Sequence, residues 1–515
     1  MTRRSFMSGS LSFAAAALFS SRAWGATTTL RPRFPAYPFT LGVASGDPSA
    51  DGFVLWTRLA PLPLEENGGM GPDAVEVSWQ VASDEAMMRI VARGTTLASA
   101  AWGHSVHIEV AGLKPAHEYW YQFKAGAELS PKGRTRTLPS ADALPEYFRF
   151  AFASCQHYEA GLYTAYEHMA REDLDLVIHL GDYIYEGAAR DKFPRRHNSG
   201  TIFSLHDYRA RYALYKSDPA LQAMHARAPW VVTWDDHEVV NNYANDIPGN
   251  AGSMTRDAFL LRRAAAYQAY YEHMPLRASA LPTGPEMLLY RRLRCGRLAD
   301  FHVLDTRQYR TDQPCGDGTQ PPCPDALNPH ATALGVQQRD WLLHGLDHSS
   351  STWNVLAQQI MMARVDRRPG PEVAMSMDQW PGYEIERRHL LQHFHERKTK
   401  NPVVLTGDIH SNWANDLVID FDPSEEKVVA TEFVGTSISS GGDGTDQPKH
   451  TPQLLSENPF VKYHNTERGY VRCELTPTTW RTDYQTVPYV TKPGAPLTTR
   501  ASFVVESGHP GLQKA

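Results

Sequence analysis

The sequence predicts an α/β fold preceded by a small N-terminal all-β domain, because the pattern of apolar residues changes once along the chain. Within residues 36–140, short alternating runs are separated by turn residues, which is typical of the strands of a β-sandwich. From residue 148 onward, short apolar strands alternate with helical segments, as they do in α/β domains. We therefore expect a β-sandwich domain over residues 36–140 and a larger α/β domain over residues 147–500.

The strands of the first domain are expected at residues 53–57, 75–81 and 105–110, and these runs contain no convincing helix. Lys114 and Pro115 followed by Tyr119 resemble the tyrosine corner of fibronectin-type and immunoglobulin-like sandwiches, in which the tyrosine hydroxyl bonds to nearby backbone. The stretch 135–145 is rich in Ser, Ala and Pro, and it is the expected linker.

The apolar runs of the second domain each end in polar residues. Ligand sites on α/β sheets gather in the loops that follow the carboxyl ends of the strands. These polar residues are therefore the candidates for a functional site. The expected strands are residues 148–153, 174–180, 230–234, 298–304, 353–356 and 402–405, and the expected helices are residues 160–170, 256–273 and 335–346.

Residues 1–25 have the features of a twin-arginine (Tat) signal peptide. Arg3 and Arg4 precede an apolar run at residues 11–19, and small residues precede Ala26, where signal peptidase would cut. The alternative, a membrane anchor, is disfavoured because this run is far shorter than the ~20 residues that span a bilayer. We expect the Tat translocase to export the folded protein to the periplasm or beyond, with no stable membrane insertion. Tat export often carries proteins loaded with a cofactor, which hints at a metal.

The composition excludes several classes of protein. The 515 residues include 51 Lys and Arg against 57 Asp and Glu, for a formal charge of −6, so no basic excess favours specific nucleic-acid binding. Five cysteines are too few for a disulfide framework in a chain of this length. A local bridge between Cys315 and Cys323 is compatible with an oxidising compartment.

Two of the strand ends carry residues that are ambiguous when taken alone. Cys155 follows the first apolar strand, where a buried structural cysteine would be the commoner interpretation. Asp182 follows the second strand, and its two oxygens could bridge two cations. Tyr185 lies three residues further on and could return as a phenolate ligand, although a loop aspartate near an aromatic residue is equally ordinary.

Two other strand ends concentrate acids and histidines. Asp236 and His237 belong to the sequence Trp-Asp-Asp-His-Glu, and Asn241 follows shortly after. Adjacent carboxylates at the end of a buried strand repel one another unless a cation lies among them. Asp408 and His410 are two residues apart, so in an extended backbone their side chains point to the same side and can address one site.

Together these motifs resemble the calcineurin-like metallophosphoesterase superfamily, and most closely its PhoD-type alkaline phosphatases. The resemblance spans nearly the whole chain and departs from the wider superfamily where Cys155 replaces the opening Asp-x-His motif. It implies a metallophosphoesterase α-β-β-α sandwich core behind a fibronectin- or immunoglobulin-like domain. The motifs that carry it are residues 41–48, 54–58, 152–155, 182–185, 234–238, 304–309, 377–383 and 406–413.

The resemblance also implies a ligand set of Fe³⁺ beside Ca²⁺. Cys155 and Tyr185 match the thiolate and phenolate expected on the iron, Asp182 would bridge the cations, and His410 would serve the iron or the phosphate. Asp408 and Asn241 offer hard oxygens suited to calcium. The resemblance implies one more metal ligand, which is either Asp236 or Asn241. It also implies that Arg58 reaches the phosphate from the small domain.

The implied function is the hydrolysis of phosphate esters by a metal-activated water. His237 is the candidate to orient the ester or protonate the leaving alkoxide, and the alternative is a histidine that only fixes a ligand. Two other functions stay open at this point: a phospholipase D-like phosphodiesterase acting on lipid or polymer diesters, and a much less favoured non-catalytic exported binding protein. A serine hydrolase is disfavoured because residues 436–442 lack a Gly-x-Ser-x-Gly motif.

Overall fold

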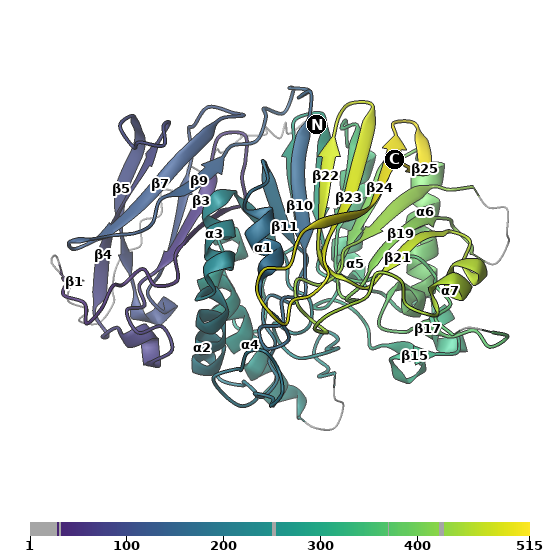
Figure 1. Ribbon diagram of the computed structural model, residues 1–515, viewed down its shortest axis with the longest axis horizontal. Coiled ribbons are helices and arrows are strands. Elements are labelled where there is room, and N and C mark those ends of the chain that lie inside the picture. Colours follow the sequence, from purple (N-terminus) through teal and green to yellow (C-terminus); the bar gives the residue numbers. More distant parts are fainter. Residues whose placement is uncertain (1–27, 30–31, 250–253, 369, 422–426) are drawn as a thin grey trace, which may run out of the picture.

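The computed structural model describes residues 28–29, 32–249, 254–368, 370–421 and 427–515. The expected signal peptide, residues 1–25, lies outside the described residues. Two large β-sheets pack face to face in the centre of the molecule, helices cover their outer faces, and a smaller β domain extends to one side (Figure 1). In the described part of the chain, no helix combines the length and the apolar character needed to cross a membrane.

The first large sheet has ten strands in the order β25-β24-β23-β22-β10-β11-β12-β2-β3-β6. Its centre is parallel, since β10 pairs with β11 and β11 with β12. Strand β24 crosses residue 500, where we expected the domain to end, and β25 lies beyond it. The strands are β2 (Val43–Gly46), β3 (Phe53–Arg58), β6 (Ser105–Val110), β10 (Phe148–Ala153), β11 (Leu176–His179), β12 (Trp230–Val232), β22 (Arg468–Leu475), β23 (Thr479–Val487), β24 (Thr498–Glu506) and β25 (His509–Lys514).

The second large sheet has seven strands in the order β13-β14-β16-β18-β20-β19-β21. The run from β14 through β16 and β18 to β20 is parallel. The strands are β13 (Arg291–Cys295), β14 (Ala299–Val303), β16 (Trp353–Ala357), β18 (Pro402–Thr406), β19 (Asn412–Leu417), β20 (Ala430–Val434) and β21 (Val461–Asn465), and a separate two-stranded ribbon joins β15 (Thr319–Gln320) to β17 (Met375–Ser376).

Helices bury their apolar sides against the outer face of each large sheet, which confirms the expected α-β-β-α order. Side chains of α1, α2, α3 and α4 form one core with the first sheet, and α5 and α6 form another with the second. Local signals set the helix starts: Ser204 and Asp207 form a capping box at α2, and Thr255 caps α4. The helices are α1 (Thr164–Met169), α2 (Leu205–Lys216), α3 (Pro219–Arg227), α4 (Arg256–His273), α5 (Gly335–Asp347), α6 (Glu384–Glu396) and α7 (Thr451–Glu457).

The small domain shares its second layer with the large sheet. Its own sheet packs on β2, β3 and β6, which also continue the ten-stranded sheet past β12. The tyrosine corner is present, because the Tyr119 hydroxyl accepts the backbone N–H of Lys114 at 3.0 Å. The strands of this sheet are β1 (Thr28–Thr29), β4 (Ala74–Ala82), β5 (Ile90–Ala98), β7 (Glu118–Ala125), β8 (Glu128–Leu129) and β9 (Gly133–Arg136).

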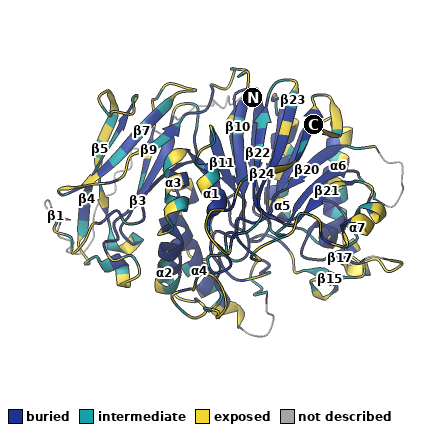
Figure 2. Ribbon diagram, in the orientation of Figure 1, coloured by how far each residue is buried: buried dark blue, intermediate teal, exposed yellow. Residues whose placement is uncertain are grey.

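The interface between the two large sheets is an apolar core, seen as the dark blue strands of Figure 2. Trp480 of β23 lies in this core, with its ring centre 5.7 Å from those of Phe150 and Trp353 and 6.3 Å from that of Phe433. Its indole N–H donates to the Thr482 hydroxyl at 2.8 Å, so the buried polar atom is satisfied. One side chain therefore contacts three aromatic rings drawn from both sheets.

We expect Trp480→Ala to lower the free energy of unfolding by about 3–5 kcal/mol, because it removes a large buried aromatic side chain and leaves a cavity. Urea denaturation followed by far-ultraviolet circular dichroism measures this. Val336→Ala is the control, since Val336 is 59% exposed on α5 and its truncation should change stability by less than about 0.5 kcal/mol. Equal stability of the two variants would contradict this account of the core.

Candidate active site

The candidate residues lie at one edge of the sandwich, where the parallel strands of both large sheets end. An isolated parallel bridge between Ser154 and Ser437 joins the end of β10 to the end of β20, so the two sheets meet here. The loops after β10, β11, β12 and β18 carry Cys155, Asp182, Asp236 and Asp408, respectively.

The backbone at these strand ends takes a conformation that residues other than glycine rarely adopt. Cys155, Asp182, Asp408 and His410 have φ values of 58°, 59°, 62° and 53°. Such left-handed residues cost energy and gather at functional sites, where they aim side chains that a regular strand would point elsewhere. The expectation that Asp408 and His410 extend to one side is therefore replaced by a left-handed turn that brings both to the site.

The first group of possible metal ligands contains a thiol, a carboxylate and an imidazole. Ligand atoms of Cys155, Asp182 and His410 all lie within 4.8 Å of one another. Tyr185 joins this group, because its hydroxyl donates to Asp182 Oδ2 at 2.7 Å and lies 3.2 Å from His410 Nε2. The structure thus brings together Cys155 and Tyr185, which the resemblance assigned to the iron, with the bridging Asp182 and with His410, which it assigned to the iron or the phosphate.

Two further groups continue from the first. Asp182, Asp236 and His237 form one, and Asp236, Asp378 and Asp408 form the other, each with ligand atoms within 4.8 Å. Asp182 belongs to the first two groups and Asp236 to the last two. The three groups therefore form a continuous row in which two carboxylates are shared between neighbouring positions.

Asp378 was not among the residues that we singled out. It lies in the loop between β17 and α6, far in sequence from the other carboxylates. The only signal in the sequence was its place in the motif at residues 377–383, which gave no role to any single residue. Its carboxylate accepts hydrogen bonds from Arg307 at 2.9 Å and from Gln313 at 2.8 Å.

Arg307 is the buried cation of this cluster and was also missed as a site residue. Its Nε donates to Asp235, and its Nη2 lies 3.5 Å from an oxygen of Asp236 and 3.6 Å from one of Asp408. The loop after β14 places it between the loops that carry these acids. One guanidinium thus faces four carboxylates, including that of Asp378.

The charges of this cluster do not balance within the protein. Burial, together with the charges of Asp182 and Asp408, holds the pKa of the Cys155 thiol well above its usual value. Burial and neighbouring acids likewise raise the pKa of Asp182. Oxygens of Asp182 and Asp236 and Arg307 Nη2 are buried without hydrogen-bond partners in the structure. Bound cations would pair these oxygens and favour the ionised forms, so the donor set fits metal ions.

His237 is held by a carboxylate that we did not assign. Its Nδ1 lies 2.6 Å from Glu186 Oε2, and its ring lies against that of Tyr185 with centres 4.1 Å apart. Burial disfavours the charged imidazole, but Glu186, Asp182 and Asp236 outweigh it and hold the pKa of His237 well above its usual value. Glu186 also accepts the backbone N–H of Asn241 at 3.0 Å, which fixes its orientation.

The structure separates the two candidates for the remaining ligand position. Asp236 is buried among the other candidate ligands, whereas Asn241 is exposed and contributes its backbone N–H to Glu186. The adjacent Asn242 donates from its backbone to Asp236 Oδ2 at 2.8 Å. The geometry therefore favours Asp236 as the ligand.

A disulfide-closed loop contacts residues next to the site. Cys315 and Cys323 are bonded, and Asp317 between them accepts a hydrogen bond from the Asn242 side chain at 2.7 Å. The carbonyl of Gly318 accepts the N–H of Met377, next to Asp378. The loop thus supports residues adjacent to two of the candidate ligands.

The structure does not place Arg58 at this site. Arg58 is 1% exposed, and its guanidinium donates to the Gly103 carbonyl at 2.7 Å and contacts His273 Nε2 at 2.7 Å. These partners lie in the small domain and at the end of α4. The expectation that Arg58 reaches the phosphate is therefore wrong, because its donors are directed into the junction between the small domain and α4.

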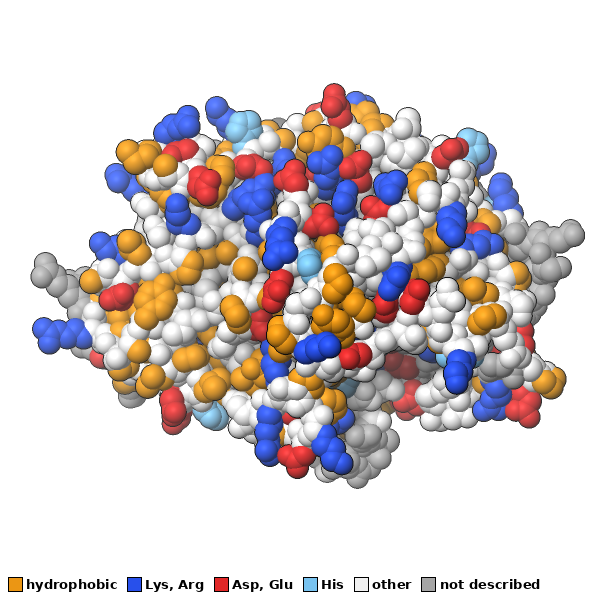
Figure 3. Space-filling view, in the orientation of Figure 1, with side chains coloured by type: hydrophobic (Ala, Val, Ile, Leu, Met, Phe, Trp, Pro, Cys, Tyr) orange, Lys and Arg blue, Asp and Glu red, His pale blue; other side chains and the backbone are white. Residues whose placement is uncertain are grey.

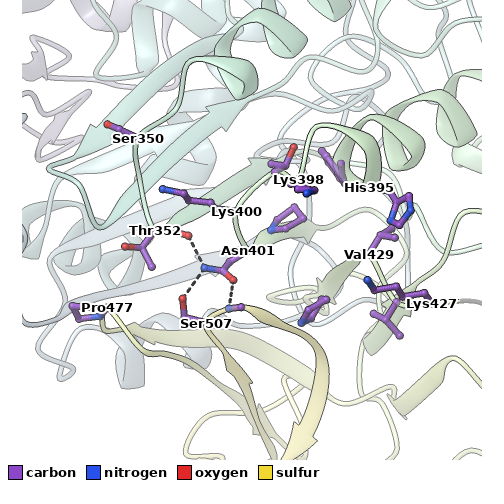
Figure 4. A pocket seen from close by; sticks show the side chains of 16 residues that line it. Ser350, Thr352, His395, Lys398, Lys400, Asn401, Lys427, Val429, Pro477 and Ser507 are labelled. Carbon is purple, nitrogen blue, oxygen red and sulfur yellow. Dashed lines mark hydrogen bonds between the residues drawn. The ribbon is translucent and has the colours of Figure 1, made fainter.

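A cavity of about 550 Å³ lies at the opposite end of the second sheet (Figure 4). Asn401, just before β18, donates to the Thr352 carbonyl at 2.7 Å and to Ser507 Oγ at 2.9 Å in this cavity. Lysines contribute to its wall, but none of the candidate metal ligands does. On the face drawn in Figure 3, acidic and basic side chains are interspersed among the described residues.

Comparisons with known proteins agree with the geometry. The family described as PhoD-like phosphatase matches residues 150–484, and its N-terminal domain matches residues 25–139. Alkaline phosphatase D from Bacillus subtilis (strain 168) is 54% identical over 488 residues, covering 94% of this chain and 83% of the relative. A solved structure of PhoD has a TM-score of 0.91 and 53% identity, covering 94% of this chain and 93% of that one.

These matches decide between the functions that the sequence left open. They favour phosphatase activity over the phospholipase D-like alternative, and they make the chain an enzyme rather than a binding protein. They also account for the α-β-β-α core and the all-β domain in front of it. The chain belongs to the PhoD-like phosphatase family and hydrolyses phosphate esters.

Proposed function

We propose that this phosphatase works with Fe³⁺ and Ca²⁺ held by the row of ligand groups at the strand ends. The observation that carries the proposal is the sharing of Asp182 and Asp236 between neighbouring groups. A thiolate and a phenolate suit a strongly charged ferric ion, so Cys155 and Tyr185, with His410, would hold the iron. Carboxylate oxygens suit calcium, so Asp236, Asp378 and Asp408 would hold it, and Asp182 would bridge.

When bound, such cations would neutralise phosphoryl oxygens and lower the pKa of a bound water far below that of bulk water, toward about 7. The protein's own part is to fix the donors before substrate arrives. The left-handed turns at Cys155, Asp182 and Asp408 and the hydrogen bonds from Arg307 and Asn242 do this. Preorganised donors avoid the cost of rearranging them during the reaction.

His237 is the residue proposed to hold and transfer a proton. With Asp182 and Asp236 engaged by cations, Glu186 is the carboxylate left to stabilise the charged imidazole. Because Glu186 bonds to Nδ1 of His237, Nε2 of the same ring is free to donate a proton to the leaving alkoxide. Glu186 therefore acts as a positioning residue, since it works through the His237 ring.

We also propose that the protein reaches its place of action by Tat export, to the periplasm or the medium. The support is the twin arginine at Arg3 and Arg4, the short apolar run and the cleavage site before Ala26. The disulfide between Cys315 and Cys323 fits an oxidising compartment. Folding before export would let the metal site form in the cytoplasm.

We expect Cys155→Ala to lose bound iron and to lower kcat by at least about 100-fold, because it removes the thiolate ligand while the fold survives. Elemental analysis, turnover of a phosphomonoester and circular dichroism measure the three quantities. Cys473→Ala is the matched control, since Cys473 is also buried but lies in the core between the sheets. Full iron and full activity in Cys155→Ala would refute the assignment.

We expect Glu186→Gln to lower kcat by about 10–100-fold for esters of poor leaving groups and much less for nitrophenyl esters. The reason is that a misoriented imidazole hampers proton donation, which good leaving groups do not need. Glu172→Gln is the control, because Glu172 is a partly buried carboxylate bonded to Tyr470 on another part of the sheet. An equal loss for both leaving groups would show that Glu186 acts on structure alone.

We expect replacement of both Arg3 and Arg4 by Lys to leave active enzyme in the cytoplasm, because the twin arginine is what the Tat machinery reads. Cell fractionation followed by phosphatase assay measures the distribution. Arg22→Lys, in the same leader, should leave export unchanged. Normal export of the double variant would exclude the Tat route.

A further inference from the structure

Most donors of the buried arginines at the site are engaged by protein groups, although Arg307 Nη2, Arg310 Nε and Arg468 Nε make no hydrogen bond. Arg307 is bonded to Asp235 and Asp378. Arg310 donates to Asp378 at 2.5 Å, and Arg468 donates to the His410 carbonyl at 2.7 Å and to Ser437 Oγ at 2.6 Å. With Arg58 directed elsewhere, none of these arginines presents a whole guanidinium to a phosphate dianion entering the site.

Arg367 is such a cation. It is half-buried in the segment between β16 and β17, and its backbone is fixed by a hydrogen bond from its N–H to the Ala374 carbonyl at 2.8 Å. Among the described residues, no carboxylate lies within 4 Å of its guanidinium, and its side chain makes no hydrogen bond. Its five donors are therefore open to a ligand.

The surroundings of Arg367 place it beside the turn that carries two candidate ligands. Its guanidinium carbon lies 6.0 Å from the centre of the Trp413 ring. The indole N–H of Trp413 donates to Ser411 Oγ at 2.8 Å, and Ser411 follows directly after Asp408–His410. Burial lowers the pKa of Arg367 and the charge of Asp408 opposes this, so Asp408 is the carboxylate that acts on it.

Burial of a guanidinium without a counter-charge is energetically unfavourable, so an anion bound to Arg367 would stabilise it. Desolvating a charge is unfavourable unless a counter-charge arrives, and a phosphate offers several oxygens to the guanidinium fork. The neighbouring Arg368 shows the contrast, because it is exposed and already paired with Glu372 at 2.8 Å.

We propose that Arg367 binds the phosphoryl group of the substrate and favours phosphomonoesters over diesters by pairing with the second anionic oxygen. A phosphomonoester carries close to two negative charges above its second pKa of about 6, whereas a diester carries one. The oxygen that is esterified in a diester is the one that loses its charge. This inference rests on the proposed function of the site and assigns its substrate class.

The test compares Arg367→Gln, Arg367→Lys and the control Arg368→Gln as metal-loaded enzymes. Calorimetry with inorganic phosphate reports binding without turnover, and kinetics with a nitrophenyl monoester and its matching diester report specificity. We expect Arg367→Gln to weaken phosphate binding and to raise KM for the monoester by about 10-fold or more, as for the loss of charged hydrogen bonds. KM for the diester should change by less than about 3-fold. Arg367→Lys should fall between, and metal content should be unchanged.

Two results would overturn the proposal. One is phosphate binding by Arg367→Gln that equals that of Arg368→Gln, and the other is an equal loss on the monoester and the diester. The calorimetric arm keeps this outcome distinct from a failure of the proposed function. The metal-loaded wild-type enzyme could bind phosphate through Arg367 and yet turn over independently of Cys155 and of the metals. In that case the proposed metal-dependent function would fail, while the role of Arg367 in phosphate binding would stand.

Discussion

The site depends on the packing of several buried carboxylates around two guanidinium groups, those of Arg307 and Arg310. Arg307 is bonded to Asp235 and Asp378 and lies within 4 Å of Asp236 and Asp408, and Asp182 adds a further acid nearby. Two guanidinium groups cannot balance five buried acids, and unpaired buried charge is unfavourable. Cations among the oxygens would stabilise the ionised form of this arrangement, so the donor set of the folded chain fits metal ions.

The sandwich makes this concentration of charge geometrically feasible. Parallel strands of both sheets end at one edge, so loops from distant parts of the chain converge there. The apolar core around Trp480 fixes the position of the two sheets relative to each other. Left-handed residues at the strand ends then turn the side chains inward, and the disulfide-closed loop supports Asp378 from outside. The surrounding strands hold these left-handed residues in their strained backbone conformation.

Arg58 shows that a sequence motif does not predict the direction of a side chain. Its sequence context resembles that of a phosphate-binding arginine, yet its donors are used by Gly103 and His273 within the molecule. Side-chain direction depends on what packs against the strand, and that information is absent from the motif. Glu186 illustrates the reverse, because it lay within the predicted loop but acquired a role only when folding placed it against His237.

The sequence by itself determined the two patterns of secondary structure, the family, and the strand-end residues Cys155, Asp182, Asp236, Asp408 and His410. It could do so because apolar periodicity is local and because the order of the motifs is written along the chain. Only the tertiary structure decided that Asp378 and Arg307 belong to the same cluster, that Asp236 is better placed than Asn241, and that Arg367 has open donors. These facts depend on distances between segments far apart in sequence, and burial and hydrogen-bond partners exist only after the chain has folded.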